Sequence, residues 1–245
     1  MPEKEDEIVQ HLLNGQIEIV GNFPWGSNYT FLVEVFYQSK SHLAVYKPTR
    51  GEQPLWDFPT ASLAHRETAA YLVSREIDWD FVPITIFRNN GPLGKGSLQY
   101  YIPHNPDYHY FNFSYEDIQR LRPVVLFDIL INNADRKGSH MIFDEDHKLW
   151  LIDHGVCFHV DPKLRTVIWD FVGEIIPQKL RLDLETFLQR YVRNNENDLF
   201  FLQLLSEHLG LDEIEMLFKR IEKLLSLKKF PEPDKDRRFY PWPQL

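Results

Sequence analysis

Two aspartates, Asp135 and Asp153, are the residues whose types and spacing point most directly to chemistry. Residues 140–152 lie between them, and there two short apolar runs are separated by the polar segment 144–147. This pattern predicts a β-hairpin, which would bring Asp135 and Asp153 to one pocket at its two open ends. In such a pocket, one carboxylate can orient or deprotonate a nucleophile while the other holds a divalent metal ion on a phosphate.

The residues around both aspartates resemble two consecutive motifs of the phosphatidylinositol 3-/4-kinases. Asp135-Arg136-Lys137-x-x-His140 is similar to their catalytic loop, Asp-Arg-His-x-x-Asn, and Asp153-His154-Gly155 is similar to the Asp-Phe-Gly metal motif that follows it. The step of five residues from Asp135 to His140 also matches the general protein-kinase pattern. The chain thus resembles a small, bacterial-type family related to these lipid kinases. Actin-fragmin kinases and bacterial persistence toxin kinases are similar atypical kinases.

The resemblance implies a role for each residue of the two motifs. Asp135 would be catalytic by orienting or deprotonating the acceptor hydroxyl, and Lys137 would stabilise charge on the transferred phosphoryl group. Asp153 would hold Mg²⁺ between the phosphates of ATP. His140 stands where the kinases have a metal-binding asparagine. Because Mg²⁺ prefers oxygen ligands, this exchange leaves three alternatives, namely a single metal ion, Mn²⁺, or impaired transfer.

Polar residues near Asp135 are expected to support the predicted catalytic loop. Arg136 would anchor the loop to a backbone carbonyl or a carboxylate, and Asn133 would support the same turn. Asp128 lies on an apolar helical segment seven residues before Asp135 and is a candidate to brace the loop by hydrogen bonding.

A lysine and a glutamate from the first half of the chain complete the expected phosphate site. Lys47 follows the apolar run 43–46, where a buried ammonium group needs an anionic partner. Glu67 lies on a mostly apolar face of a helix predicted over residues 62–77, with Thr60 or Ser62 as its cap. The resemblance pairs Lys47 with Glu67 and places Lys47 on the α- and β-phosphates. The alternative is a surface lysine and a solvated glutamate.

Further nucleotide contacts are expected from a turn and from the connector between lobes. Gly26, Ser27 and Asn28 lie in the turn between two predicted strands, where kinases offer backbone N–H groups to the phosphates, although an ordinary hairpin loop is the alternative. Residues 99–103 are the expected connector, whose backbone binds adenine in kinases. Gln99 and Tyr101 are therefore candidate nucleotide-binding residues.

The periodicity of the sequence predicts an α+β chain. Strands are expected over residues 16–20, 30–37, 43–48, 81–87 and 97–102, and C-terminal helices over 183–192, 198–209 and 212–227. With the resemblance, this order predicts a two-lobed protein-kinase-like fold, with a β-rich N-lobe over 1–103 and a mainly helical C-lobe over 104–245. Residues 230–245 form a proline-rich tail that is expected to pack onto the body.

Composition narrows the possible environments and partners. A net charge of −9 argues against a nucleic-acid-binding surface. The chain has no long apolar run for stable membrane insertion, and its acidic start argues against a signal peptide. Its one cysteine, Cys157, suits a reducing compartment and reads as a small buried residue. We therefore expect a cytoplasmic protein, and the resemblance implies a nucleotide as its ligand.

The acceptor and the reaction itself stay open. The segment after Gly155 is not strongly basic, so a lipid head group, a protein hydroxyl and a small molecule are all possible acceptors. A kinase-like protein could instead transfer AMP, or it could be a pseudokinase that binds nucleotide or acts as a scaffold. A metal-hydrolase cluster is a further alternative, formed by His140, His147, Asp153, His154 and His159. However, no familiar ligand spacing such as His-Glu-x-x-His is present.

Overall fold

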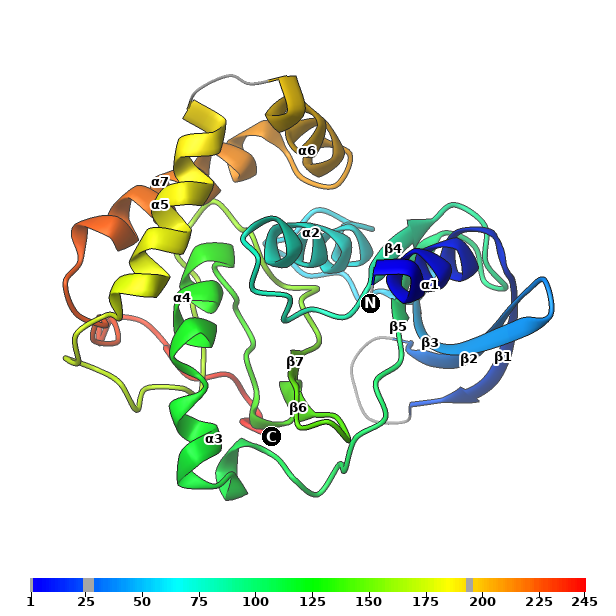
Figure 1. Ribbon diagram of the computed structural model, residues 1–245, viewed down its shortest axis with the longest axis horizontal. Helices are drawn as coiled ribbons and strands as arrows, with labels where there is room; N and C mark the ends of the chain where they lie inside the picture. The colour runs from blue at the N-terminus through cyan, green and yellow to red at the C-terminus, as the bar shows by residue number, and fades with distance from the viewer. Residues whose placement is uncertain (1, 24–28, 193–195) are drawn as a thin grey trace.

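The two-lobed α+β arrangement is seen in a computed structural model that describes residues 2–23, 29–192 and 196–245 (Figure 1). The N-terminal lobe contains α1 (Pro2–Asn14), β1 (Gln16–Asn22), β2 (Phe31–Tyr37), β3 (Lys40–Pro48), α2 (Leu63–Glu76), β4 (Thr85–Arg88) and β5 (Gly96–Tyr100). The C-terminal lobe contains α3 (Tyr115–Gln119), α4 (Arg122–Ile131), β6 (Met141–Phe143), β7 (Leu149–Leu151), α5 (Gln178–Val192), α6 (Glu196–Ser206) and α7 (Leu211–Ser226). The predicted boundary between residues 103 and 104 stays a prediction.

The N-terminal lobe is built on a five-stranded antiparallel sheet with the strand order β1-β2-β3-β5-β4. Because side chains alternate between the faces of a sheet, Ala44 and Tyr46 of β3 share one face with Leu98 of β5. These residues form an apolar core with Ile8 and Leu12 of α1. Helix α1 therefore covers this face of the sheet, as Figure 1 shows.

The opposite face of the sheet carries the predicted lysine. Lys47 is the cross-strand partner of Ser97, so the two side chains lie on the face turned away from α1. Gln99 follows Ser97 by two residues on β5 and lies on the same face. The strand register thus separates the apolar packing of α1 from the polar face that contains Lys47.

Helix α2 contacts β4 and β5 of the sheet and also packs with the C-terminal lobe. Ala69, Ala70 and Val73 of α2 are buried in the same core as Leu126 and Leu130 of α4. In Figure 1, α2 accordingly lies between the sheet and the C-terminal helices. The first two turns of α2 therefore lie at the boundary between the lobes.

The strand predicted over residues 81–87 begins later, at Thr85. Ser74 Oγ of α2 accepts hydrogen bonds from the backbone N–H groups of Phe81 (2.8 Å) and Val82 (3.2 Å). The carbonyl of Phe81 accepts from the N–H of Leu151 in β7 (2.8 Å). Because these backbone groups are used elsewhere, the segment joins α2 to the β6–β7 hairpin instead of extending β4.

A helix cap and a proline shape the start of the second lobe. Ser114 Oγ accepts from the N–H of Asp117 (3.1 Å) and caps α3. Pro123 lies in the first turn of α4, where its missing N–H costs no helical hydrogen bond. The helix therefore ends after α3, and a new helix, α4, leads to Asn132 and the predicted catalytic loop.

The C-terminal helices and the tail close the larger core. The last predicted helix, 212–227, corresponds to α7, which buries an apolar stripe at Ile214, Leu217, Ile221 and Leu224. The tail packs onto the body as expected, since the carbonyl of Phe239 accepts from the N–H of Thr166 (3.0 Å). The carbonyl of Gln244 accepts from the N–H of Gly138 (2.8 Å), which lies in the segment between Lys137 and His140. Every helix in the described ranges is too short or too polar to cross a membrane.

The N-terminus of α2 is capped by a residue that the sequence did not predict. The carboxylate of Glu52 accepts from the N–H groups of Leu63 (3.2 Å) and Ala64 (3.0 Å). Ser62 makes no side-chain cap, and its hydroxyl donates to the carbonyl of Pro59 (2.7 Å) instead. A carboxylate there satisfies two free helix donors and opposes the helix dipole.

Replacing this cap should weaken the whole domain. We expect Glu52→Ala to lower the free energy of unfolding by about 1 kcal/mol, as the loss of a helix cap typically does. Urea denaturation followed by circular dichroism measures the change. Ser62→Ala is the matched control and should cost less than half as much. An equal or larger loss for Ser62→Ala would contradict the assignment of Glu52 as the cap.

Candidate active site

The loop after α4 is shaped by hydrogen bonds from its own side chains. Asn132 ends the helix in the left-handed region (φ 51°), a conformation that asparagine tolerates better than most residues. Asn133 Oδ1 accepts from the N–H of Asp135 (2.9 Å), and Asn133 Nδ2 donates to Asp128 Oδ1 (3.1 Å). Asn133 therefore supports the turn as expected and fixes the backbone of Asp135.

Arg136 is the anchor of this loop. Its guanidinium is fully buried and donates to both carboxylate oxygens of Asp128, at 2.9 Å to 3.1 Å. It also donates to the carbonyls of Ile152 (3.0 Å) and His140 (3.3 Å). The Arg136 guanidinium thus ties α4, the predicted catalytic loop and Ile152 together. Asp128 braces the loop through this contact, as expected.

Lys47, Glu67 and Asp153 meet at the boundary between the lobes. Lys47 Nζ lies 3.0 Å from Asp153 Oδ1 and forms a close ion pair with Glu67 Oε1. The other oxygen of Glu67 accepts from the N–H of His154 (3.0 Å). The predicted partners Lys47 and Glu67 are therefore together, and Asp153 joins them from the other lobe.

The charges of Lys47 and Asp153 shift the pKa values of each other. Burial works against the ammonium of Lys47, but the carboxylates of Asp153 and Glu67 raise its pKa above the ordinary value. Burial likewise opposes ionisation of Asp153, but the Lys47 ammonium beside it holds the pKa of that carboxyl well below its usual range. The Asp153 side chain is still 49% exposed. An ionised, accessible carboxylate is the donor that a hard divalent cation requires.

His140 contacts the second oxygen of Asp153. Its Nε2 lies 3.3 Å from Asp153 Oδ2, and its Nδ1 accepts from the N–H of Lys137 (3.4 Å). Burial lowers the pKa of His140 to about 3, so the ring is neutral. With Nδ1 as the acceptor, the single ring proton lies on Nε2 and is donated to Asp153. In this arrangement His140 orients the carboxylate, and its role as a metal ligand stays a prediction.

Asp135 and Lys137 form a partly exposed ion pair. Lys137 Nζ lies 3.2 Å from Asp135 Oδ2, and both side chains are partly exposed. Burial raises the pKa of Asp135 to about 6, although the Lys137 ammonium acts in the opposite direction. A carboxylate with a pKa near neutrality can accept a proton from a hydroxyl, the property expected of a general base.

Gln99 and Tyr101, the two named candidates on the predicted adenine-binding connector, already make other hydrogen bonds. Gln99 lies on the Lys47 face, with Nε2 donating to Thr85 Oγ1 (2.8 Å). The backbone N–H of Tyr101 donates to the carbonyl of Leu43 (3.0 Å), so a contact with adenine would have to use another backbone group of the connector. The predicted phosphate-binding residues Gly26, Ser27 and Asn28 lie outside the described residues.

A cavity of about 350 Å³ lies beside the connector but is separate from this site. Tyr71 of α2, Tyr100 of β5, Ile102 and Trp150 of β7 are among its lining residues. Tyr100, Ile102 and Pro103 of the predicted connector line it, but Lys47, Asp135 and Asp153 do not. The candidate active site is therefore defined by the converging charged side chains and not by this cavity.

His154 is a supporting residue whose role the sequence did not reveal. Its Nε2 lies 2.9 Å from Arg136 Nη2 in the fully buried interior, and burial holds the pKa of this histidine well below its ordinary value. A neutral Nε2 accepts from the guanidinium there. Within the described part of the chain, the five candidate residues of a metal hydrolase do not gather at ligand distance. His154 thus packs against the anchor of the loop.

Comparison with known proteins establishes kinship and fold. No protein-family model matches the chain. It is 34% identical to Protein Rv2133c of Mycobacterium tuberculosis over 267 aligned positions, which cover 95% of this chain and 93% of that protein. The chain therefore belongs to the same family as Protein Rv2133c. The name of that relative describes no activity, so the kinship alone assigns none.

Two solved structures share the architecture. The Helicobacter pylori proinflammatory kinase CtkA superposes with a TM-score of 0.54 at 11% identity, covering 89% of this chain and 94% of that one. Hydra Fam20, solved with sugar, has a TM-score of 0.54 at 14% identity, covering 91% of this chain and 88% of that one. The predicted kinase-like α+β fold is thereby confirmed. Similarity at this level of identity shows the fold alone.

Removing the counterion of Arg136 should destabilise the protein strongly. Asp128→Asn preserves the size of the side chain but leaves a buried guanidinium without its opposite charge. We expect the free energy of unfolding to fall by about 3–5 kcal/mol, measured by urea denaturation at neutral pH. Glu215→Gln, which breaks the exposed pair between Glu215 and Lys219, is the control and should change stability by less than about 0.5 kcal/mol. A loss below about 1 kcal/mol for Asp128→Asn would refute the proposed anchor.

The raised pKa of Asp135 predicts how stability depends on pH. The folded value is about 6 and the ordinary value is 3.8, so between these pH values the folded protein binds more protons than the unfolded chain. This group therefore stabilises the fold at low pH, and its contribution is lost as the pH rises through about 6.

Asp135→Asn removes this dependence. Relative to the native chain, the variant should gain stability on the order of 3 kcal/mol between acidic and neutral pH, measured as the difference between urea unfolding curves. The exposed Asp146 provides the control, because Asp146→Asn should follow the native curve. A pH-independent difference between Asp135→Asn and the native chain would show that Asp135 has an ordinary pKa.

Proposed function

We propose that this chain is an ATP-dependent phosphotransferase of the phosphatidylinositol 3-/4-kinase-related type, which transfers the γ-phosphoryl group to a hydroxyl. The observation that carries the proposal is the convergence of Lys47, Asp153 and Asp135, which come from three separate segments of the chain. Lys47 contacts Asp153 across the lobe boundary, and Asp135 is tied to the same framework through Arg136 and Asn133.

Lys47 and Asp153 are suited to hold the triphosphate. In the proposal, the Lys47 ammonium, kept in place by Glu67, binds the α- and β-phosphates, and Asp153 binds Mg²⁺ or Mn²⁺. The donors fit such an ion, since Asp153 offers an ionised and half-exposed carboxylate. The ion, when bound, would neutralise phosphate charge. Gly26, Ser27, Asn28 and the connector that contains Gln99 and Tyr101 would supply the remaining nucleotide contacts.

Asp135 and Lys137 are suited to the transfer step. Asp135 would orient the acceptor hydroxyl and accept its proton, for which its pKa of about 6 is appropriate. The Lys137 ammonium, 3.2 Å from Asp135, would stand beside the developing negative charge of the transferred group. In phosphoryl transfer, positioning and electrostatic stabilisation of this kind supply most of the catalysis. The acceptor can be a protein, a lipid head group or a small molecule.

His140 supports a second candidate function. A second metal ion would normally be held at this position, but here a neutral imidazole donates to Asp153. A protein with this arrangement could bind nucleotide through Lys47 and Asp153 and yet transfer no phosphate, as a nucleotide-sensing pseudokinase. Transfer of AMP by the same fold is the other alternative, and it requires a different reactive phosphorus atom.

Nucleotide binding and transfer can be separated by two substitutions. Thermal unfolding with ATP and Mg²⁺ should show stabilisation of roughly 2.7 kcal/mol at one hundred times the dissociation constant. Asp153→Ala should abolish the metal-dependent part of this stabilisation, whereas Asp135→Ala should keep it. Label from γ-labelled ATP should appear in an acceptor or in hydrolysis product, and Asp135→Ala should slow this by about 10²–10⁴-fold.

The controls distinguish the alternatives. Asp146→Ala, on the exposed β6–β7 turn, should leave binding and transfer unchanged. Incorporation of label from α-labelled ATP would indicate AMP transfer, and ATP binding without any transfer would indicate the pseudokinase. If neither Asp153→Ala nor Asp135→Ala alters any response to nucleotide, the assignment of this site is wrong.

A further inference from the structure

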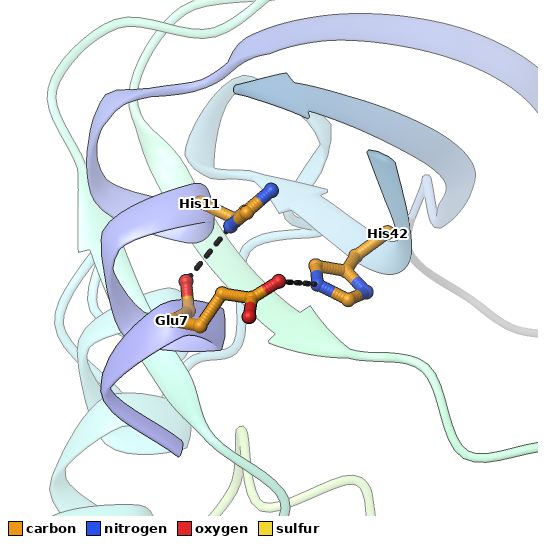
Figure 2. A group of neighbouring side chains, drawn as sticks. All are labelled: Glu7, His11 and His42. Atoms are coloured by element: carbon orange, nitrogen blue, oxygen red, sulfur yellow. Dashed lines mark hydrogen bonds and ion pairs between the residues drawn. The ribbon is translucent and has the colours of Figure 1, made fainter. Parts of the chain in front are cut away.

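A second cluster of polar side chains lies on the α1 face of the sheet, away from the candidate active site. Glu7 and His11 come from α1, and His42 comes from β3 (Figure 2). Each offers one potential ligand atom, and these atoms lie within 4.8 Å of one another. Among the described residues, no other group of three histidine, cysteine or acidic side chains brings its ligand atoms this close together.

The local structure explains why these residues meet. Glu7 and His11 are four residues apart on α1 and therefore lie on one side of the helix, beside the core residues Ile8 and Leu12. His42 is the cross-strand partner of Val35, whose side chain belongs to the same core. His42 consequently faces α1, and its ring centroid lies 4.5 Å from that of His11.

His11 is a buried histidine with an unused nitrogen. The residue is only 4% exposed, and its Nδ1 lies 2.8 Å from the backbone carbonyl of Glu7. Because a carbonyl only accepts, Nδ1 carries the proton, and Nε2 keeps a free lone pair. Nε2 has no hydrogen-bond partner although it is buried. Metal-binding histidines commonly donate their other ring N–H to a backbone carbonyl in this way.

The ring of His42 is in a similar state. Its Nε2 is buried without a hydrogen-bond partner and lies 3.7 Å from Glu7 Oε1. Two unsatisfied ring nitrogens beside one carboxylate are unusual in a folded protein, in which buried polar atoms are nearly always paired.

We propose that Glu7, His11 and His42 form a binding site for a divalent transition-metal ion, with Zn²⁺ as the best match, that clamps α1 to the sheet. Two imidazoles and one carboxylate are ligands that Zn²⁺ accepts, whereas Mg²⁺ and Ca²⁺ prefer oxygen alone. Tetrahedral ligands at Zn²⁺ bond lengths stand about 3.3 Å apart. Binding therefore draws the three side chains together and leaves the fourth position to water.

Lys40 occupies the carboxylate when no ion is bound. Its Nζ lies 2.8 Å and 2.9 Å from the two oxygens of Glu7, and its side chain is 63% exposed. An exposed ion pair of this kind is weak, so a metal ion can displace it. Lys40 is thus a competitor of the ion for Glu7, which gives the site a distinctive response to substitution.

The experiment titrates Zn²⁺ into the full chain, without a polyhistidine tag, by isothermal calorimetry. Co²⁺ replaces Zn²⁺ in a parallel titration followed by visible absorption. The background is Asp153→Ala, which removes the carboxylate that could attract an ion at the candidate active site. We expect one ion per chain. Glu7→Gln and His42→Gln, both at partly exposed side chains, should each weaken binding at least about tenfold.

Lys40→Met is the decisive variant. It breaks the same ion pair as Glu7→Gln, but it frees the carboxylate and should tighten Zn²⁺ binding severalfold. If the pair has a purely structural role, the two variants will shift binding in the same direction. His147→Gln, on the exposed hairpin turn, is the control and should bind as the background does.

The remaining outcomes overturn the proposal. The proposal is wrong if the untagged chain does not bind Zn²⁺. It is also wrong if the chain binds Zn²⁺ but neither Glu7→Gln nor His42→Gln weakens the binding. Weaker binding by Lys40→Met would have the same consequence. The result does not depend on the phosphotransferase proposal, because the site lies on the other face of the sheet and its test uses no nucleotide.

Discussion

The buried contact between Arg136 and Asp128 is the interaction on which the site depends. An arginine without solvent must find acceptors for its N–H groups, and here Asp128, Ile152, His140 and His154 provide them. These partners come from α4, from both ends of the β6–β7 hairpin and from the segment that follows it. Satisfying one buried charge therefore helps to set the distance between the two halves of the candidate active site, which contain Asp135 and Asp153.

A second set of charges links the lobes. Glu67 sits on a helix that packs with the C-terminal core, yet its carboxylate pairs with Lys47 of the sheet and accepts from the backbone of His154. Lys47 in turn reaches Asp153. Each of these groups would be costly to bury alone, and Lys47 and Asp153 each favour the ionised form of the other. The arrangement holds an accessible carboxylate ready for a cation, and the proposed triphosphate would add the negative charge that Lys47 is placed to meet.

The two faces of the N-terminal sheet have different chemistry for a simple reason. Because side chains alternate between the two faces of a sheet, Lys47 and Gln99 lie on the face nearer Asp153. His42 lies on the opposite face, which α1 covers. The proposed phosphate site and the proposed metal site are therefore separated by the thickness of the sheet. An ion bound to His42 and α1 would act on the helix packing of the lobe and leave the phosphate-facing residues untouched.

The pairing of Lys47 with Glu67 was an expectation from the resemblance to the phosphatidylinositol 3-/4-kinases. The sequence by itself determined the α+β order and the hairpin between the two aspartates, because local periodicity and a polar turn segment carry that information. It did not reveal Glu52 as the cap of α2, the late start of β4 or the contact of His154 with Arg136. Each of these depends on a tertiary contact, such as that between the backbone groups of Phe81 and Leu151. The same is true of Glu7 and His42, which are unremarkable in sequence. Only the packing of α1 on the sheet brings them together, since burial of the apolar residues beside them decides which polar side chains must meet.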